Sequence, residues 1–266
     1  MLDLPDPPSF LFARGSLESL RDPVVAIVGT RGASPYGERV ARELSGALAR
    51  AGACVISGMA RGIDAVAHRA AFDAGGRSAA VLGTGVDVVY PAANKALYGD
   101  LVARGVVLSE ELPGERADAG SFPRRNRIIA ALARATIVVE AGVRSGALIT
   151  ATHALELGRT VAAVPGPIDA PQSAGTNELL RDGAVVIASV ADALALVGVS
   201  PPGRRDPALR SPGERLVWDA LSAGALDLDT LATRAGLPAS ECLAAVTTLE
   251  LAGAIECAMT GEIRRR

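Results

Sequence analysis

Cysteine, histidine and lysine are scarce in this chain, and each shortage narrows the chemistry that it can support. Cys54, Cys242 and Cys257 are odd in number and lack CxxC spacing, which predicts neither a disulfide framework nor a zinc site. His68 and His153 are the only histidines, so a histidine-based metal centre is not expected. The sequence therefore predicts no metal site.

Long apolar runs are missing as well. No stretch reaches the roughly 20 uninterrupted apolar residues that a membrane helix needs, although 49% of the chain is hydrophobic. The N-terminal sequence MLDLPDPPSF also lacks the charged-then-apolar order of a signal peptide. We therefore expect a cytoplasmic protein with no membrane partner.

The charges do not predict an extended basic surface. Residues 23–197 carry 17 basic and 16 acidic side chains, a net charge of +1, whereas residues 211–266 carry 5 and 8, a net charge of −3. All 27 basic residues except Lys95 are arginine. A nucleic-acid partner would have to be bound by local clusters of arginine and not by overall charge.

Short runs rich in Val and Ile alternate with helical stretches over most of the chain. Such continuous apolar runs are typical of strands buried on both faces of a parallel sheet. After the first run, Ser34 is expected to cap a helix that begins at Pro35 and ends at Gly52. The pattern predicts a doubly wound α/β domain, in which ligands bind outside the carboxyl ends of the strands. The seven runs are VVAIV (24–28), ACVIS (53–57), SAAVL (78–82), VVLS (106–109), TIVVE (136–140), TVAAV (160–164) and AVVIA (184–188).

Glycine-containing turns follow four of these runs, and three of the turns contain an arginine. Small residues let a phosphate approach the backbone closely, and arginine neutralises its charge. One such turn alone is typical of an ordinary solvated loop, but the repetition favours a phosphate-binding crevice at the sheet edge. The turns are Gly29 to Gly32 with Arg31, Gly58 to Asp64 with Arg61, Gly83 to Gly85, and Ala141 to Gly146 with Arg144.

The run SFPRRNRII (121–129) concentrates basic side chains where a helix is expected to begin. Pro123 fits the first helical position, so Arg124, Arg125 and Arg127 would surround a helix N-terminus, a favourable place for phosphates. Phe122 offers a ring on which a base can stack. The alternative is a solvated helix end with Phe122 in the core. Together with the turns, the run favours nucleic acid as the ligand.

Familiar nucleotide-binding and catalytic signatures are not found. The dinucleotide fingerprint fails because no third glycine follows Gly83-x-Gly85, and Lys95 lacks the glycine-rich loop of a Walker A motif. A G-x-S-x-G nucleophile elbow is also missing. His68 lies four residues after Asp64 on a predicted helix, which favours a structural pair over a catalytic one. We expect neither an enzyme nor a cofactor.

Six motifs resemble, in order and spacing, the DNA-processing protein A family, also called DprA or Smf. The resemblance covers about residues 10 to 197, through GTR, SGMARGIDAVAH, VLGTGVDVVYP, FPRRNRIIAAL, EAGVRSGALITA and AVPGPIDAPQSAGTNELLRDGA. It implies a Rossmann-like fold that binds single-stranded DNA in a basic pocket and dimerises. It also implies that the protein protects incoming DNA and loads the RecA recombinase onto it in natural transformation. The implied DNA-contacting residues are Arg31, Ser57, Gly58, Arg61, Phe122, Arg124, Arg125, Asn126 and Arg127, to which we add Arg144 from its turn.

The chain departs from many members of that family in two ways. Many members resemble this chain but carry an additional N-terminal helical domain, whereas only about 20 residues precede the first predicted strand here. Lysines that members often have in the DNA pocket are mostly arginine or missing in this chain. A nucleotide-phosphate-binding enzyme remains the alternative, because the fold is similar to that of nucleotide phosphoribohydrolases. Their Pro-Gly-Gly-x-Gly-Thr signature is replaced here by Ala141 to Gly146, with Glu140 before it.

The C-terminal part reads as a separate, small α+β domain that resembles a winged helix. Residues 240–245 offer no side chain suited to reading base edges, so we favour a protein-interaction or regulatory module over a duplex-DNA reader. Only Arg264 to Arg266 support phosphate contact. Helices are expected at 213–221, 229–235 and 240–252, with a wing at 255–263. The expected organisation is an N-terminal extension (1–22), a Rossmann-like DNA-binding domain (23–197), a Pro-, Gly- and Arg-rich linker (198–210) and the winged-helix-like domain (211–266).

Overall fold

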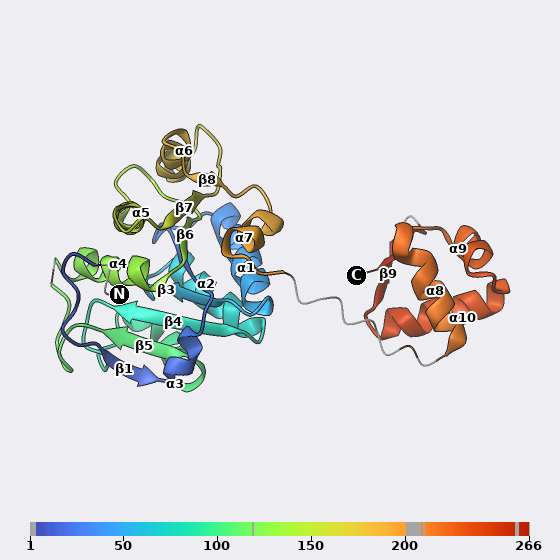
Figure 1. The fold of residues 1–266 in the computed structure, drawn as a ribbon, viewed down its shortest axis with the longest axis horizontal. Coiled ribbons are helices and arrows are strands. Elements are labelled where there is room, and N and C mark those ends of the chain that lie inside the picture. Colours follow the sequence, from blue (N-terminus) through green and yellow to red (C-terminus); the bar gives the residue numbers. More distant parts are fainter. Residues whose placement is uncertain (1–3, 119, 201–208, 210, 259–260, 266) are drawn as a thin grey trace. The chain divides into compact units, whose positions relative to one another are not determined.

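The chain forms two compact units, Met1–Gly203 and Arg204–Arg266. The computed structural model describes residues 4–118, 120–200, 209, 211–258 and 261–265 (Figure 1). Most of the predicted linker, residues 201–208 and 210, lies outside the described residues, as does Arg266. Each unit is described by itself.

The first unit is built on an eight-stranded sheet in the order β1-β5-β4-β3-β2-β6-β7-β8. All neighbouring strands are parallel except β1, which pairs antiparallel with β5. The seven predicted strands are confirmed, each displaced at its ends by no more than two residues. The strands are β1 (Phe12–Gly15), β2 (Val24–Val28), β3 (Cys54–Ser57), β4 (Arg77–Leu82), β5 (Val106–Ser109), β6 (Ala135–Val138), β7 (Thr160–Ala163) and β8 (Val185–Val186).

Helices cover both faces of this sheet, as predicted for a doubly wound, Rossmann-like fold (Figure 1). Apolar side chains alternate between the faces because successive strand residues point in opposite directions. Val25 and Ile27 pack beneath one helical layer, and Ala26 and Val28 beneath the other. One layer contains α1 (Pro35–Arg50), α2 (Ile63–Asp73), α3 (Lys95–Arg104) and α7 (Val190–Val197), and the other contains α4 (Ser121–Leu132), α5 (Gly146–Glu156) and α6 (Ala174–Arg181).

The strand order reverses between β2 and β6. From β2 the chain adds β3, β4 and β5 on one side, then returns through α4 to place β6 on the other side of β2. At such a reversal the loops after the two strands diverge and leave a crevice outside the carboxyl ends. The turns that contain Arg31 and Arg144 follow β2 and β6, so the topology places both at this crevice.

Strand β1 is the one element of the sheet that the sequence does not predict. Its four residues, FARG, are mostly exposed, and only Phe12 is partly buried. It lies at the edge of the sheet, where a strand needs neither the length nor the apolar character of a central one. The segment before the first predicted strand therefore contributes to the sheet through Phe12–Gly15.

The second unit has the predicted winged-helix elements around a core of its own. Val217, Trp218, Leu231, Val246 and Leu249 are buried together. Among the described residues of both units, none of the helices has the length and apolar character needed to cross a bilayer. The elements are α8 (Pro212–Ala220), α9 (Leu228–Ala235), α10 (Ala239–Leu251), β9 (Ile255–Cys257) and β10 (Ile263–Arg265).

The predicted pair between Asp64 and His68 on α2 is wrong. The Asp64 carboxylate accepts hydrogen bonds from the backbone N–H groups of Gly58 and Ala60, at 3.1 and 3.3 Å. His68 Nδ1 lies 2.7 Å from Ser78 Oγ on β4. Spacing along a helix brings two side chains to one face, but loop amides and a neighbouring strand compete for them. Burial lowers the pKa of His68 to about 3, so the ring is neutral in the folded protein.

This buried histidine predicts a specific dependence of stability on pH. Below its unfolded pKa of 6.5 the ring takes up a proton only in the unfolded chain, so the free energy of unfolding falls as the pH drops toward 3. His68→Gln removes this contribution. Between about pH 6 and pH 4 the variant should lose stability less steeply than the wild type, by about 1.4 kcal/mol per pH unit. Urea unfolding followed by circular dichroism measures both slopes, and parallel curves would contradict the assignment.

Candidate functional site

Two adjoining clefts lie at the carboxyl edge of the sheet. The larger, about 680 Å³, lies at the reversal between β2 and β6, and the smaller, about 350 Å³, lies beside the loop after β3. Arg31, Ala60, Phe122 and Arg125 line both. The larger cleft is also lined by Thr30, Asn126, Arg144, Ser145 and Thr150, among others, and the smaller by Gly58, Arg61, Tyr90 and Pro91.

The loop that carries Arg31 is fixed at both ends by Glu140. The Thr30 N–H donates to the Glu140 backbone carbonyl at 2.7 Å, and the Ser34 N–H and hydroxyl donate to its carboxylate at 2.8 and 2.6 Å. Ser34 also caps α1 by accepting from the Gly37 N–H, as predicted. A side chain at Gly37 would collide with the Glu140 carboxylate. Glu140 thus occupies the N-terminus of α1 and holds the exposed Arg31 at the mouth of the clefts.

The loop after β3 is held by the Asp64 carboxylate. Its hydrogen bonds with the Gly58 and Ala60 amides curl the backbone, and Met59 between them adopts a left-handed φ of 55°. A non-glycine residue in this region carries strain, which persists where surrounding contacts enforce it. The next residue after this curl, Arg61, is exposed and lines the smaller cleft.

Arg125 lies beneath the clefts and not at their mouth. Its side chain is buried, with Nη1 donating to the carbonyls of Gly58, at 2.8 Å, and Val81, while Nε donates to Asn126 Oδ1 at 3.1 Å. Burial lowers the pKa of Arg125 to about 10, which leaves it charged at neutral pH. Burial also raises the pKa of Asp64, and the Arg125 charge opposes that rise. The guanidinium therefore ties α4 to the ends of β3 and β4 and adds positive charge from below.

Aromatic rings and a guanidinium form the partition between the two clefts. The Arg31 guanidinium carbon lies 5.3 Å from the centre of the Phe122 ring, within cation–π range. The Tyr90 and Phe122 ring centres are also 5.3 Å apart, with the planes inclined at 34°. Tyr90 is half exposed. The sequence predicts Phe122 as a stacking residue but not Tyr90, although the tyrosine directly precedes Pro91 in the motif VLGTGVDVVYP.

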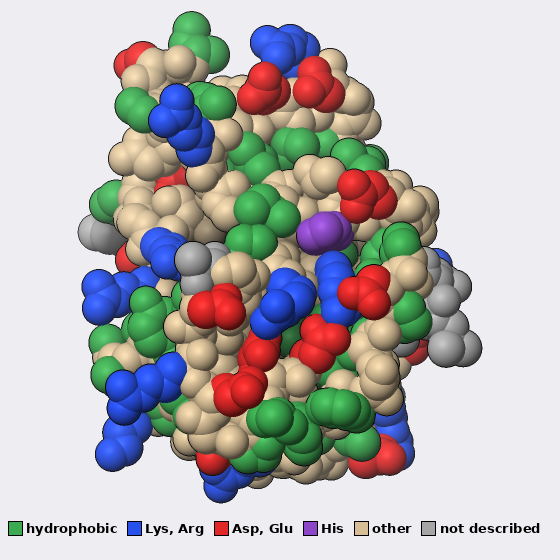
Figure 2. Space-filling model, turned by 90° about the vertical axis from the view of Figure 1, so that its left-hand side faces the viewer, with side chains coloured by type: hydrophobic (Ala, Val, Ile, Leu, Met, Phe, Trp, Pro, Cys, Tyr) green, Lys and Arg blue, Asp and Glu red, His purple; other side chains and the backbone are tan. Residues whose placement is uncertain are grey.

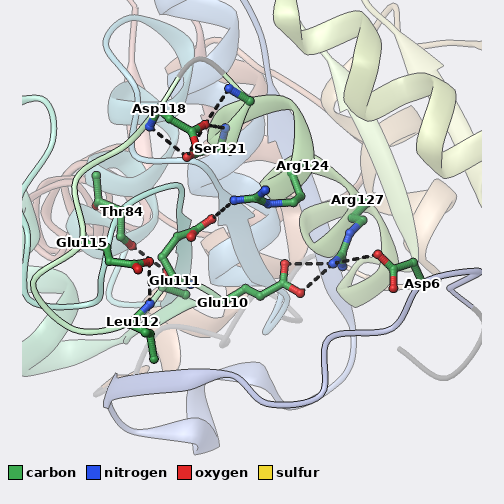
Figure 3. A network of polar contacts seen from close by, with 12 residues as sticks. Asp6, Thr84, Glu110, Glu111, Leu112, Glu115, Asp118, Ser121, Arg124 and Arg127 are labelled. Atoms are coloured by element: carbon green, nitrogen blue, oxygen red, sulfur yellow. Dashed lines mark hydrogen bonds and ion pairs between the residues drawn. The ribbon is translucent and has the colours of Figure 1, made fainter.

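The sequence places Arg124 and Arg127 among the DNA-contacting residues, but neither side chain lines the clefts. Helix α4 begins at Ser121, two residues before the predicted start, and successive helical side chains diverge by about 100°. Arg124 therefore pairs with Glu111 at 2.6 Å, and Arg127 pairs with both oxygens of Glu110 at 2.7 and 2.9 Å (Figure 3). Figure 2 shows basic and acidic side chains next to one another over the centre of the face that it draws. The three arginines of the run have three different settings.

The remaining predicted residues divide between the cleft wall and its support. Arg144 is exposed and lines the larger cleft. Asn126 Nδ2 donates to the Gly146 carbonyl at 3.1 Å, which joins α4 to the start of α5. Ser57 is buried and donates to the Ile27 carbonyl at 2.6 Å, while Gly58 packs against the Arg125 guanidinium. Ser57 and Gly58 therefore shape the loop rather than present a polar side chain to a ligand.

The setting of Arg125 predicts a large loss of stability on its removal. Arg125→Met leaves two carbonyls and the buried Asp64 carboxylate without their cation, which should lower the free energy of unfolding by about 3–5 kcal/mol. Arg124→Met is the matched control and should cost no more than about 1 kcal/mol, since the Arg124 side chain is about half exposed. Circular dichroism suits the measurement because Trp218, the only tryptophan, lies in the other unit. Equal losses in the two variants would refute this account.

Comparison with known proteins assigns both parts of the chain. The family model of DNA recombination-mediator protein A matches residues 1–198, and that of the DprA winged helix domain matches residues 200–258. A putative DNA processing protein DprA from Mycobacterium tuberculosis is 43% identical over 261 residues, an alignment that covers 94% of this chain and 67% of the relative. Protein Smf from Escherichia coli is 39% identical over 277 residues, covering 100% and 74% of the two chains.

Solved structures agree with this assignment. The X-ray structure of DprA from Streptococcus pneumoniae superimposes with a TM-score of 0.70 at 44% identity, covering 73% of this chain and 68% of that one. DprA from Helicobacter pylori, whose structure describes a single-stranded DNA binding mode, gives 0.68 at 32% identity and covers 74% and 90%. The predicted resemblance and fold class are confirmed: this chain belongs to the DprA/Smf family, the DNA recombination-mediator protein A family.

Proposed function

We propose that this chain is a non-catalytic protein that binds single-stranded DNA in the two adjoining clefts. The observation that carries the proposal is the convergence of Arg31, Arg61 and Arg144 on clefts floored by the buried Arg125. Arginine binds phosphates in a bidentate manner, and the unpaired bases of a single strand can stack on exposed rings such as that of Tyr90. A duplex keeps its bases stacked inside and gains nothing from these rings.

The nucleotide-enzyme alternative is less favoured. In nucleotide-binding folds of this topology the phosphate lies at the N-terminus of the first crossover helix. Here Glu140 already fills that position on α1 with a negative charge, and Gly37 packs directly against it. A phosphate would be repelled there and has no room. Release of a base from a nucleoside monophosphate by the purified protein would count against our choice.

Family membership supports a cellular role for this binding activity. The Helicobacter pylori relative is described as binding single-stranded DNA, and we extend this property to the present chain. We propose that the protein protects incoming single strands and loads the RecA recombinase onto them in natural transformation, which places it in the cytoplasm. The winged-helix unit, with its net charge of −3 over residues 211–266, suits a protein partner better than DNA.

We also propose that the protein forms a homodimer through the late part of the first unit. Among the described residues strand β8 pairs only with β7, and its two residues, Val185 and Val186, are both exposed. Ile168, in the loop after β7, is fully exposed. An exposed apolar strand edge invites pairing with a second chain.

Single substitutions of the exposed cleft arginines test the binding site. Arg61→Ala and Arg144→Ala should each weaken binding of a labelled single-stranded oligonucleotide in fluorescence anisotropy titrations. Each lost phosphate contact should make the dependence of log K on log salt shallower by about 0.7. Arg42→Ala, an exposed arginine on α1 that lines neither cleft, is the control for charge alone. If both cleft variants bind the oligonucleotide with the same affinity and salt dependence as the control, the proposal is wrong.

The dimer proposal has its own test in light scattering at micromolar concentration. The wild type should have twice the mass of the chain, and Val186→Asp should shift it toward the monomer, because the charge would be buried at the interface. Leu216→Asp, an exposed apolar position in the other unit, should leave the mass unchanged. A monomeric wild type contradicts the proposal.

A further inference from the structure

Three of the four carboxylates in the loop between β5 and α4 contact the anion-binding features of α4. Glu111 pairs with Arg124 and Glu110 with Arg127 (Figure 3). Asp118 Oδ1 accepts from the N–H groups of Gly120 and Ser121, both at 2.7 Å, at the start of the helix. Hydrogen bonds, first that of the Ser121 hydroxyl, hold the pKa of Asp118 below its usual range, so it is ionised there. The features that would hold phosphates already hold this chain's own anions.

The Arg124–Glu111 and Arg127–Glu110 pairs differ in how far the arginine side chain is exposed to solvent. The Arg124 side chain is 48% exposed, so a phosphate from solvent can reach it, whereas its partner Glu111 is only 18% exposed. The Arg127 side chain is 11% exposed, and a second carboxylate, Asp6, lies 3.9 Å away. Arg124 is therefore a surface cation that is neutralised by a more deeply held carboxylate.

Neither of these arginines lines the clefts of the proposed site. The cleft arginines are Arg31, Arg61, Arg125 and Arg144, and carboxylate partners within 4 Å are not found for them among the described residues. Arginines without a carboxylate partner thus line the clefts, while the two outward-facing arginines of the adjacent helix α4 are neutralised. An open basic surface next to the clefts would attract the phosphates of any nucleic acid, including a duplex.

We infer that Glu110 and Glu111 are specificity-determining residues, which withhold Arg124 and Arg127 from phosphates and so restrict DNA to a single strand lying in the clefts. This inference rests on the proposed function. The carboxylates compete with phosphates for the same guanidinium groups. Loss of these carboxylates exposes a second basic surface outside the clefts. Because this surface, among the described residues, has no aromatic rings on which unpaired bases can stack, the gain in affinity is larger for duplex than for single-stranded DNA.

Glu111→Gln is the decisive variant, because its partner Arg124 is exposed and the substitution buries no unpaired charge. Glu18→Gln is the matched control: it removes the same charge and frees Arg21, which lies before β2 and outside both clefts. Anisotropy titrations of a labelled oligonucleotide and its duplex, at several salt concentrations, compare both variants with the wild type. The double variant with Glu110→Gln extends the series.

Glu111→Gln should bind duplex several-fold more tightly at low salt and lower the preference for the single strand. The slope of log K against log salt should steepen by about 0.9 on duplex and about 0.7 on single strands for each arginine freed. An unchanged preference and slope, in a protein whose wild type binds single-stranded DNA, would overturn the inference alone. A wild type that does not bind single-stranded DNA would overturn the proposed function and the inference with it.

Discussion

The buried guanidinium of Arg125 is the contact on which the binding edge depends. It joins α4 to the carbonyl groups at the ends of β3 and β4, and its charge makes the buried Asp64 carboxylate tolerable. Asp64 in turn curls the loop that presents Arg61. Burying a charge costs desolvation, which its hydrogen bonds offset, but removing the guanidinium would leave buried acceptors unpaired. Arg125 therefore fixes a geometry more than it supplies free energy.

Carboxylates of the chain itself occupy several positions where a bound phosphate would otherwise be favoured. Glu140 fills the N-terminus of α1, and Asp118 accepts from the first amides of α4. Glu110 and Glu111 neutralise the outward-facing arginines of α4. With a net charge of only −2 for the whole chain, binding depends on where arginines without such a partner converge. Four of them line the two clefts around Arg31.

The sequence was sufficient for the architecture because strand burial and helix capping are local signals. Continuous apolar runs marked seven strands, and Ser34 with Pro35 marked the start of α1. The site was harder, since a run of arginines does not reveal the partners that each will meet. Arg124, Arg125 and Arg127 are neighbours in sequence, yet their settings differ. Arg125 is buried beneath the clefts, whereas Arg124 and Arg127 pair with glutamates of the preceding loop. Tyr90 and Glu140 lie in motifs that were recognised, but their contacts depend on tertiary structure.

The most direct test of the central claim is a crystal structure of the protein with a short oligothymidylate. The account predicts successive phosphates beside Arg31, Arg61 and Arg144, a base against the Tyr90 or Phe122 ring, and Arg125 still bound to the carbonyls of Gly58 and Val81. Phosphates bound instead to Arg124 and Arg127, with Glu110 and Glu111 displaced, would contradict it. So would DNA bound only to the winged-helix unit.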